Sequence, residues 1–300
     1  MNEPASTEAL RIVPVLAGGG TRLPVHVGVL AALRELGVCY RRLVGVSAGG
    51  IVAAFRAAGL SPAKLLDLAL EVDFSRFRGR SLIELALHGG LSSGADLERW
   101  LDGVLEGRRF ADLDLDLAIV ATDVRFSRPV VFERRSTPDV KVSHAVRCSM
   151  GIPLLFSFQP WQEGLLVDGS ILSEDVLHRD WAGDGTPVCV FRVRAGLADA
   201  APQPLNRWFP LRGYLHMLIR TFMTTISREF VDAEHWPRTI VVDSGHHSLL
   251  AFRMDHAQKT DLYRRGFETT RTVLPHKFQQ LLPGAEGAED AAREHGVHLH

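Results

Sequence analysis

One stretch of the chain decides the fold: LVGVSAGGIVAAFRAAG, residues 43–59. Its first four residues suit a buried strand, and the alanine-rich run over 48–58 is typical of a helix that Gly59 ends. Between them stands Ser47, flanked by Gly45 and Gly49 in a Gly-x-Ser-x-Gly pattern. A strand, a sharp turn and a helix in this order are one step of a parallel α/β sheet, with the serine exposed on the turn.

The same alternation of strand-length apolar runs and helical patterns continues along the chain. It predicts strands near residues 12–16, 116–122, 129–133, 164–167, 188–193 and 238–242, and helices near 24–36, 61–72, 94–106, 139–149, 173–180, 205–233 and 256–274. Pro14 is unusual in a central strand because it has no N–H to donate. The pattern indicates an α/β fold with a mainly parallel central sheet and helices on both faces.

Length and composition favour a single enzyme-sized domain. Three hundred residues with 46% hydrophobic content can bury one large core. We expect that domain over residues 11–280. The polar segment 1–10 and the Ala-, Gly- and charge-rich segment 281–300 lack an apolar period and are expected to be flexible.

The charge argues against a nucleic-acid partner, and the cysteines argue against disulfides and a thiolate metal site. The net charge of -1 provides no basic field for a phosphate backbone, so nucleic acid is not an expected partner. Cys39, Cys148 and Cys189 are scattered, which matches neither a disulfide framework nor a thiolate metal site and favours a reducing, cytoplasmic setting. Neither a signal peptide nor a membrane-spanning run is expected from the sequence.

Ser47 is the candidate nucleophile. A serine on a sharp strand-to-helix turn needs small neighbours, which Gly45 and Gly49 provide, and the following helix directs its positive end at the reaction site. The alternative is that these small residues only allow the helix to pack closely on the strand. The position of the motif between an apolar strand and an alanine-rich helix favours the catalytic interpretation.

A second glycine-rich segment, AGGGTR over residues 17–22, lies between the first strand and the first helix. Its N–H groups could converge on an anion. A dinucleotide-binding loop would need Gly-x-Gly-x-x-Gly, but Leu23 and Pro24 follow here, and the expected acidic residue about 20 positions later is absent. The segment instead suits an oxyanion hole, with Arg22 orienting the loop or meeting a lipid phosphate. A flexible connection with a surface arginine is the remaining alternative.

The general base has two candidates. Histidine is the usual partner of a catalytic serine, and His246, after the last predicted strand, is the best placed of the 13 histidines. Asp168 follows the apolar run 164–167, and a carboxylate at the carboxyl end of a strand points into the crevice where α/β sheets bind ligands. The sequence favours Asp168, although Asp-Gly is also a common turn dipeptide.

Together these residues resemble the patatin-like phospholipase family. Its hallmarks are a GGGx[RK] oxyanion loop, a GxSxG turn and a DG[GA] motif, found here in order at residues 18–22, 45–49 and 168–170. The segments 26–37, 118–124, 144–156 and 241–245, and a late helix with Leu262 and Gly266, are also similar to the family. The resemblance covers roughly residues 11–275 and implies a three-layer architecture.

The resemblance implies a lipid acyl hydrolase that uses a Ser47–Asp168 dyad and an acyl-enzyme, and that needs no metal or cofactor. The oxyanion hole would comprise Gly19, Gly20 and Arg22, with the motifs supported by Gly18, Gly45, Gly49 and Gly169. Two departures from the family pattern are Leu23, which replaces a glycine, and Ser170, which replaces glycine or alanine. They put the path of the oxyanion loop and the substrate range in doubt more than the catalysis.

Two other functions remain open at this point. An acyltransferase or thioesterase could use the same dyad, and a non-enzymatic protein could bind an anion or lipid with the glycine loop. The family implies a lipid or acyl-ester substrate and peripheral contact with a membrane. Candidates for that contact are the segment 205–211, which has aromatic residues and an arginine, and the apolar segment 214–219 that follows it.

Overall fold

The computed structural model describes residues 10–194, 214, 217–221, 233–248 and 250–279. The segments expected to be flexible lie outside this range except for Leu10, and so does most of the region 205–233, which includes the expected helix and most of the expected membrane-contact residues. All other expected strands and helices are present, with ends that differ by a few residues.

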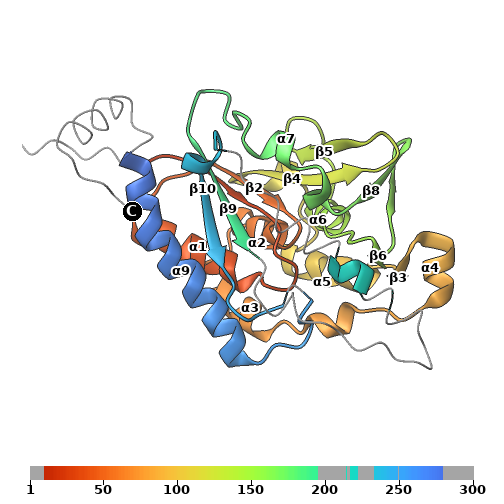
Figure 1. Ribbon diagram of the computed structural model, residues 1–300. Helices are drawn as coiled ribbons and strands as arrows, with labels where there is room; N and C mark the ends of the chain where they lie inside the picture. The colour runs from red at the N-terminus through yellow and green to blue at the C-terminus, as the bar shows by residue number, and fades with distance from the viewer. Residues whose placement is uncertain (1–9, 195–213, 215–216, 222–232, 249, 280–300) are drawn as a thin grey trace, which may run out of the picture.

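Within the described residues, eight strands form a central sheet (Figure 1). They are β1 (Val13–Leu16), β2 (Arg42–Val46), β4 (Asp116–Asp123), β5 (Arg128–Glu133), β7 (Gln159–Trp161), β8 (Gly164–Val167), β9 (Val188–Arg194) and β10 (Thr239–Asp243). The order is β10-β9-β1-β2-β4-β8-β7, and β5 also pairs with β4. The five strands from β10 to β4 are parallel, whereas β5, β7 and β8 are antiparallel to their neighbours. The expected mainly parallel sheet is confirmed.

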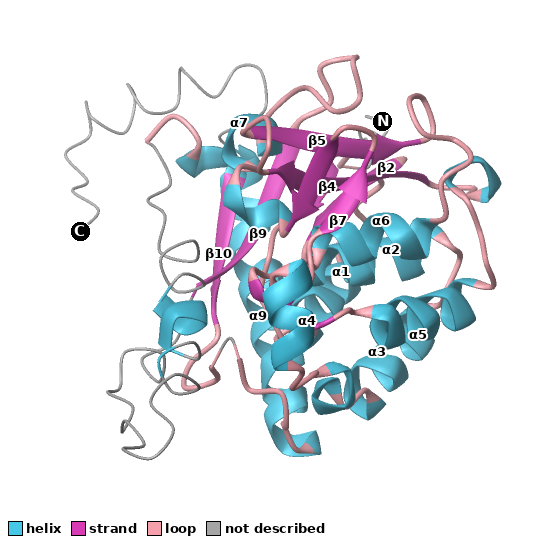
Figure 2. Cartoon of the chain, turned by 90° about the vertical axis from the view of Figure 1, so that its right-hand side faces the viewer, coloured by secondary structure: helices cyan, strands magenta, loops and turns pink. Residues whose placement is uncertain are grey.

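Helices cover the sheet as Figures 1 and 2 show. They are α1 (Pro24–Glu35), α2 (Ala48–Ala57), α3 (Pro62–Glu71), α4 (Leu82–His88), α5 (Ala95–Leu105), α6 (Val142–Ser149), α7 (Glu174–Leu177) and α9 (His256–Gln279). Alternate residues of the strands contribute to two separate apolar clusters, because successive side chains point to opposite faces of a sheet. The larger cluster contains residues of α1, α2 and α9, and the smaller one is closed by Leu177 of α7 and Trp181.

Glycines allow α1 and α9 to cross in close contact. A side chain on Gly28 would overlap the backbone of Tyr263, and one on Gly266 would overlap the carbonyl oxygen of Val25. This contact fastens the late helix to the first one and explains why Gly266 stands in that position.

Pro14 lies in the central strand β1 without breaking the sheet. Val13 and Ala17 donate their N–H groups to β9 or the residue before it, so the N–H groups of odd-numbered residues face β9. Position 14 faces the other way, and the pairing of β1 with β2 begins only at Val15. Proline at this position therefore removes no bond to β9, and it lies just before the β1–β2 ladder begins.

A smaller unit lies beside the main sheet. β3 (Gly90–Ser92) pairs in parallel with β6 (Leu154–Phe156), and α4 directly precedes β3. Neither α4 nor the strands β3, β6 and β7 were expected from the sequence. The three strands have only three residues each, too few to show an alternating pattern. None of the described helices combines the length and apolarity needed to cross a bilayer.

Candidate active site

Ser47 occupies a strained turn between β2 and α2. Its backbone has φ 51° and ψ −126°, values that residues with a side chain rarely adopt. The flanking glycines are required by close packing: a Cβ on Gly45 would lie 2.5 Å from the Cα of Gly50, and one on Gly49 would overlap the carbonyl oxygen of Leu16. The turn places the side chain of Ser47 at the positive end of α2.

Asp168 faces Ser47 from the end of β8. The Ser47 hydroxyl donates to Asp168 Oδ2 at 2.7 Å, and the N–H of Ser170 donates to the other carboxylate oxygen at 2.9 Å. Gly169 is needed here because a Cβ would overlap the carbonyl oxygen of Val120. The two side chains that the sequence placed 121 residues apart thus form a direct pair.

Burial dominates the electrostatics of Asp168. The residue is fully buried, and this desolvation raises the pKa of its carboxyl group above the ordinary value. The hydrogen bonds from the Ser170 N–H and the Ser47 hydroxyl oppose the rise because they favour the charged form. A carboxylate with a raised pKa is a better proton acceptor than one on the surface.

Two residues that sequence reasoning did not assign also contact Ser47. The Ser47 N–H donates to Ser149 Oγ at 2.8 Å, and that hydroxyl donates to the carbonyl oxygen of Val120 at 2.6 Å. The Sδ atom of Met150 lies 3.6 Å from Ser47 Oγ. Both residues belong to the segment 144–156, which resembled the family, but nothing in its pattern indicated a contact with Ser47.

Arg22 holds the glycine loop in place through hydrogen bonds. This side chain is fully buried, and its guanidinium donates to the carbonyl oxygens of Gly19 at 3.1 Å and Arg194 at 3.1 Å and to Ser244 Oγ at 2.6 Å. Of the two roles considered for Arg22, these contacts favour orienting the loop over meeting a lipid phosphate. They also exclude a flexible connection with a surface arginine.

His26 lies under the same loop. Its Nε2 atom is 3.3 Å from the carbonyl oxygen of Gly18, and burial lowers the pKa of its imidazole to about 4. The ring is therefore neutral at physiological pH and supports the loop without adding charge to it. Within the described residues, the N–H groups of Gly19 and Gly20 donate no hydrogen bond and are available to an anion.

The two departures from the family pattern are both accommodated. Leu23 is buried in the core at the start of α1, so the loop ends in a packing contact. Ser170 lies against the glycine loop, where a Cβ on Gly18 would overlap its hydroxyl. The absence of a side chain at position 18 makes room for the serine at position 170.

His246 does not join the site. It is exposed on a turn after β10, and within the described residues the hydroxyl of Ser47 bonds only to Asp168 and Met150. The neighbouring His247 instead pairs with Asp261 of α9 at 3.0 Å. The geometry gives the histidine alternative no support.

Comparison with known proteins identifies the family. The sequence model described as patatin-like phospholipase matches residues 15–178, more than half of the chain. The chain belongs to the patatin-like phospholipase family. The matched range of this patatin-like protein contains the glycine loop, the Ser47 turn and Asp168, and the resemblance noted in the sequence is confirmed.

Related sequences carry little functional information. The protein YqhO of Bacillus subtilis, described as uncharacterized, is 29% identical over 185 residues, which cover 53% of this patatin-like chain and 63% of YqhO. The uncharacterized NTE family protein Mb2594 of Mycobacterium bovis is 32% identical over 180 residues, 59% of this chain and 29% of Mb2594. The aligned region thus spans less than two thirds of either relative.

Solved structures show the same fold. VipD from Legionella pneumophila has a TM-score of 0.59 at 15% identity, covering 89% of this chain and 67% of VipD. The structure of the ExoU–SpcU complex of Pseudomonas aeruginosa gives a TM-score of 0.54 at 20% identity, covering 90% of this chain and 52% of the matched chain. At such identities the likeness concerns the patatin fold alone, while family membership itself supports lipid hydrolysis.

Proposed function

We propose that this protein is a lipid acyl hydrolase that cleaves fatty-acyl esters, with Ser47 as nucleophile and Asp168 as base. The observation that carries the proposal is the 2.7 Å hydrogen bond from Ser47 Oγ to a fully buried carboxylate. A serine needs a proton acceptor within this distance to attack an ester, and no third residue is required when the carboxylate accepts directly.

The chemistry proceeds in two steps. Asp168 accepts the hydroxyl proton while Ser47 Oγ attacks the ester carbonyl carbon, and the N–H groups of Gly19 and Gly20 bind the resulting oxyanion. The alcohol leaves with the proton from Asp168, which gives an acyl-enzyme. Asp168 then accepts a proton from water, whose oxygen attacks the acyl carbon, and the fatty acid is released as Ser47 recovers its proton.

Arg22 and His26 act on this chemistry through the loop. Arg22 donates to the Gly19 carbonyl and His26 lies against the Gly18 carbonyl, so both hold the peptide groups whose N–H atoms face the oxyanion. Because Ser47 and Asp168 are fully buried, an ester reaches Ser47 only after neighbouring atoms such as Met150 Sδ move.

Hydrolysis of a medium-chain p-nitrophenyl ester and of phospholipid vesicles tests the proposal. We expect Ser47→Ala and Asp168→Asn to lose activity and His246→Ala to keep it, since His246 is exposed and away from the pair. Activity that survives Ser47→Ala in a clean preparation would overturn the assignment and point to the glycine loop as a ligand site.

Product analysis separates hydrolysis from acyl transfer. Water and another acceptor compete for the same acyl-enzyme, so the assay is repeated with an alcohol and with a thiol present. Free fatty acid as the main product supports the hydrolase; a dominant transferred ester or thioester would replace it by an acyltransferase.

A further inference from the structure

The helix α4 has its apolar side directed away from the protein. Leu82, Ile83 and Leu87 are 62%, 74% and 67% exposed, and the helix has no buried residue. At about 100° per residue these three side chains and Ala86 fall within one continuous arc of about 140°. Single exposed leucines are common, but three large aliphatic side chains on one short helix form a patch.

The opposite side of α4 is fastened by polar contacts. Glu84 accepts a hydrogen bond from Ser157 Oγ at 2.6 Å and pairs with His88, and the carbonyl oxygen of Gly89 accepts from the Leu154 N–H at 3.2 Å. The side chain of Ser81 caps the first turn. This arrangement reverses the usual one, in which the apolar side of a helix faces the core.

A row of arginines leads into this helix. In the segment FRGRS over residues 77–81, the odd-numbered positions face β3: the carbonyl oxygen of Phe77 accepts from Ser92 Oγ, Gly79 packs against Leu91 and Ser92, and Ser81 donates its N–H to Leu91. The even-numbered positions alternate with them. Within the segment these are Arg78 and Arg80, and Arg76 lies just before it; all three are exposed or half-buried.

Two cavities open along this arginine row. Arg78 and Arg80 line one of about 330 Å³ together with Arg253, Leu250 and Phe252. Arg253 interacts electrostatically with the carboxylate of Asp73. That carboxylate also accepts hydrogen bonds from the N–H and hydroxyl of Ser75. Three guanidinium groups around one cavity suit an anionic group such as a phosphate, which arginine binds with paired N–H donors.

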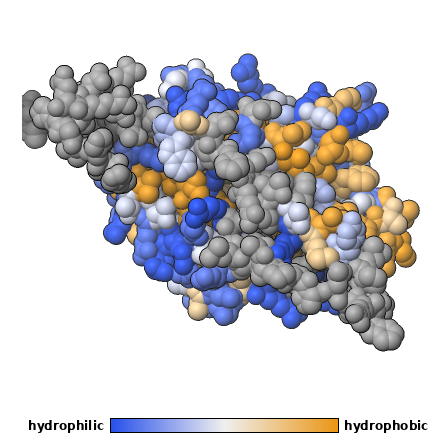
Figure 3. Space-filling view, viewed as in Figure 1, coloured by the Kyte–Doolittle hydropathy of each residue, from blue (hydrophilic) through white to orange (hydrophobic). Residues whose placement is uncertain are grey.

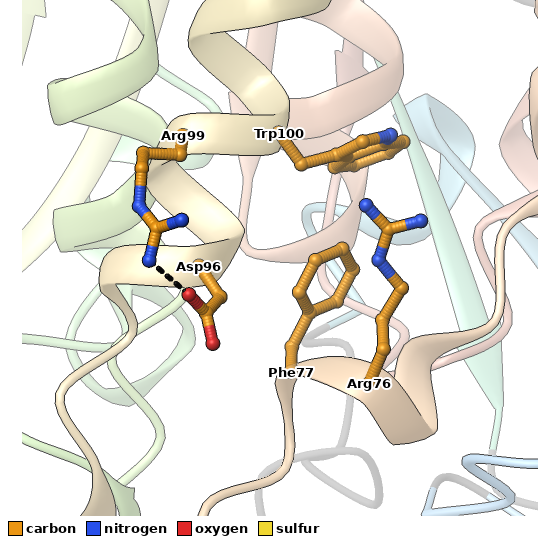
Figure 4. Close-up of a pocket in the computed structure, with 5 residues that line it drawn as sticks. All are labelled: Arg76, Phe77, Asp96, Arg99 and Trp100. Atoms are coloured by element: carbon orange, nitrogen blue, oxygen red, sulfur yellow. Dashed lines mark hydrogen bonds and ion pairs between the residues drawn. The ribbon is translucent and has the colours of Figure 1, made fainter.

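Arg76 lines the second cavity, of about 460 Å³. Figure 4 shows its guanidinium beside the rings of Phe77 and Trp100, while Arg99 is ion paired with Asp96. None of the described residues that line the first cavity is acidic, whereas Asp96 lines the second, so the first cavity is the stronger anion site.

The patch is linked to the active site by a short segment of chain. β6, which pairs with the strand after α4, begins four residues after Met150, whose sulfur contacts Ser47 Oγ. In the space-filling view, hydrophobic residues gather toward the right-hand edge, where Figure 1 places α4 (Figure 3). The segment that contacts Ser47 therefore continues directly into the strand that pairs beside α4.

We propose that α4 and the arginine row form a docking surface for an anionic lipid bilayer. The side chains of Leu82, Ile83 and Leu87 enter the boundary between headgroups and acyl chains, and the cavity of Arg78, Arg80 and Arg253 binds a headgroup phosphate. Apolar side chains beside basic ones are the combination that interfacial helices use on membranes. The inference rests on the proposed function, because it assigns the surface through which the hydrolase reaches its substrate.

Vesicle flotation with the Ser47→Ala protein tests the docking without hydrolysis of the lipid. Phosphatidylcholine vesicles with and without phosphatidylserine are compared. A basic residue near an anionic surface contributes about fivefold to partitioning, so Arg78→Gln with Arg80→Gln lowers binding to the anionic vesicles by roughly 25-fold. Ile83→Gln with Leu87→Gln lowers it by at least about tenfold, because two aliphatic side chains no longer enter the bilayer.

Matched controls remove similar groups from parts of the chain outside α4 and the arginine row. Trp236→Gln removes a large exposed side chain before β10, and Arg41→Gln with Arg135→Gln removes two charges near the amino ends of β2 and β4. These controls should bind as the parent does. Absent binding to anionic vesicles, equal loss in the controls, insensitivity to the arginine pair, or an α4 variant that changes only self-association would each overturn the proposal.

A second assay separates the two proposals. The same substitutions are made in the protein that keeps Ser47, and its hydrolysis of a soluble ester is measured. Unchanged activity on this monomeric substrate shows that the variants are folded and that any loss on vesicles concerns docking. If the wild type is inactive on the ester yet floats with anionic vesicles in a manner sensitive to both substituted pairs, the docking surface stands and the hydrolase proposal fails.

Discussion

Replacing Ser47 by glycine should relieve backbone strain that alanine keeps. At φ 51° and ψ −126°, a residue with a Cβ atom is destabilised by about 1–3 kcal/mol. Glycine avoids this penalty but loses about 0.5–1 kcal/mol through the greater freedom of the unfolded chain. The difference predicts that Ser47→Gly is more stable than Ser47→Ala by roughly 1 kcal/mol.

Denaturant unfolding followed by tryptophan fluorescence measures the difference. Both variants lose the hydroxyl that bonds to Asp168, and both keep the N–H that donates to Ser149 Oγ, so only the backbone term separates them. Ala48→Gly, one position later in the regular first turn of α2, is the control and should be destabilised by about 0.5–1 kcal/mol. A Ser47→Gly protein no more stable than Ser47→Ala would refute the idea that the turn stores strain.

Three further predictions concern the surroundings of this turn. The raised pKa of Asp168 means that ester hydrolysis falls as the pH drops through that value, above the range of an ordinary carboxyl group; a pH–rate profile that stays flat down to pH values near 4 would contradict it. Gly49→Ala should lower the free energy of unfolding by about 2–3 kcal/mol, because its Cβ would overlap the carbonyl oxygen of Leu16. Gly103→Ala, in α5 where an added Cβ would meet no other atom, should raise the free energy of unfolding by about 0.5–1 kcal/mol. If thermal unfolding shows that Gly49→Ala and Gly103→Ala change stability in the same direction, the packing argument is wrong. Arg22→Lys should lower kcat by about 10²–10³ with little change in KM, because a lysine cannot reach the same set of carbonyl oxygens; steady-state kinetics that show mainly a KM effect would instead favour direct contact with the substrate.

The parts of the site that sequence could predict are those with a local pattern. The strand, turn and helix around Ser47 have a hydrophobic period that switches within one segment, and Asp168 directly follows an apolar run. Each pattern gives the type and position of one element. The position of Asp168 at a strand end favours it as the base, and the resemblance implies its pairing with Ser47, but no period in the sequence links residues 121 positions apart.

The supporting contacts could not be predicted for the same reason. Arg22 binds the carbonyl oxygen of Arg194 and the hydroxyl of Ser244, which are 172 and 222 residues away. Whether an arginine after a glycine loop faces solvent or the core depends on which strand ends lie beside it, and that is decided by the order of the sheet. The exposed apolar side of α4 is similar: its residues are typical of a core helix, and only the structure shows which side packs.

Substitutions at Asp168 and at the glycines of the site are expected to change the free energy of unfolding in opposite directions. Asp168 has a folded-state pKa above its unfolded value, so the stabilising contribution of its protonated form is present at low pH and is lost as the pH rises through the folded value. Asp168→Asn keeps the shape and cannot ionise, so it should be more stable than the wild type at neutral pH, by about 1 kcal/mol, with the gain disappearing in acid. Gly45, Gly49 and Gly169 react with nothing, yet each is required by a close backbone contact. Unfolding at neutral pH is therefore expected to rank Asp168→Asn above the wild type and the glycine-to-alanine variants below it. An Asp168→Asn protein less stable than the wild type would mean that the carboxylate is stabilised by its two hydrogen bonds more strongly than it is destabilised by burial.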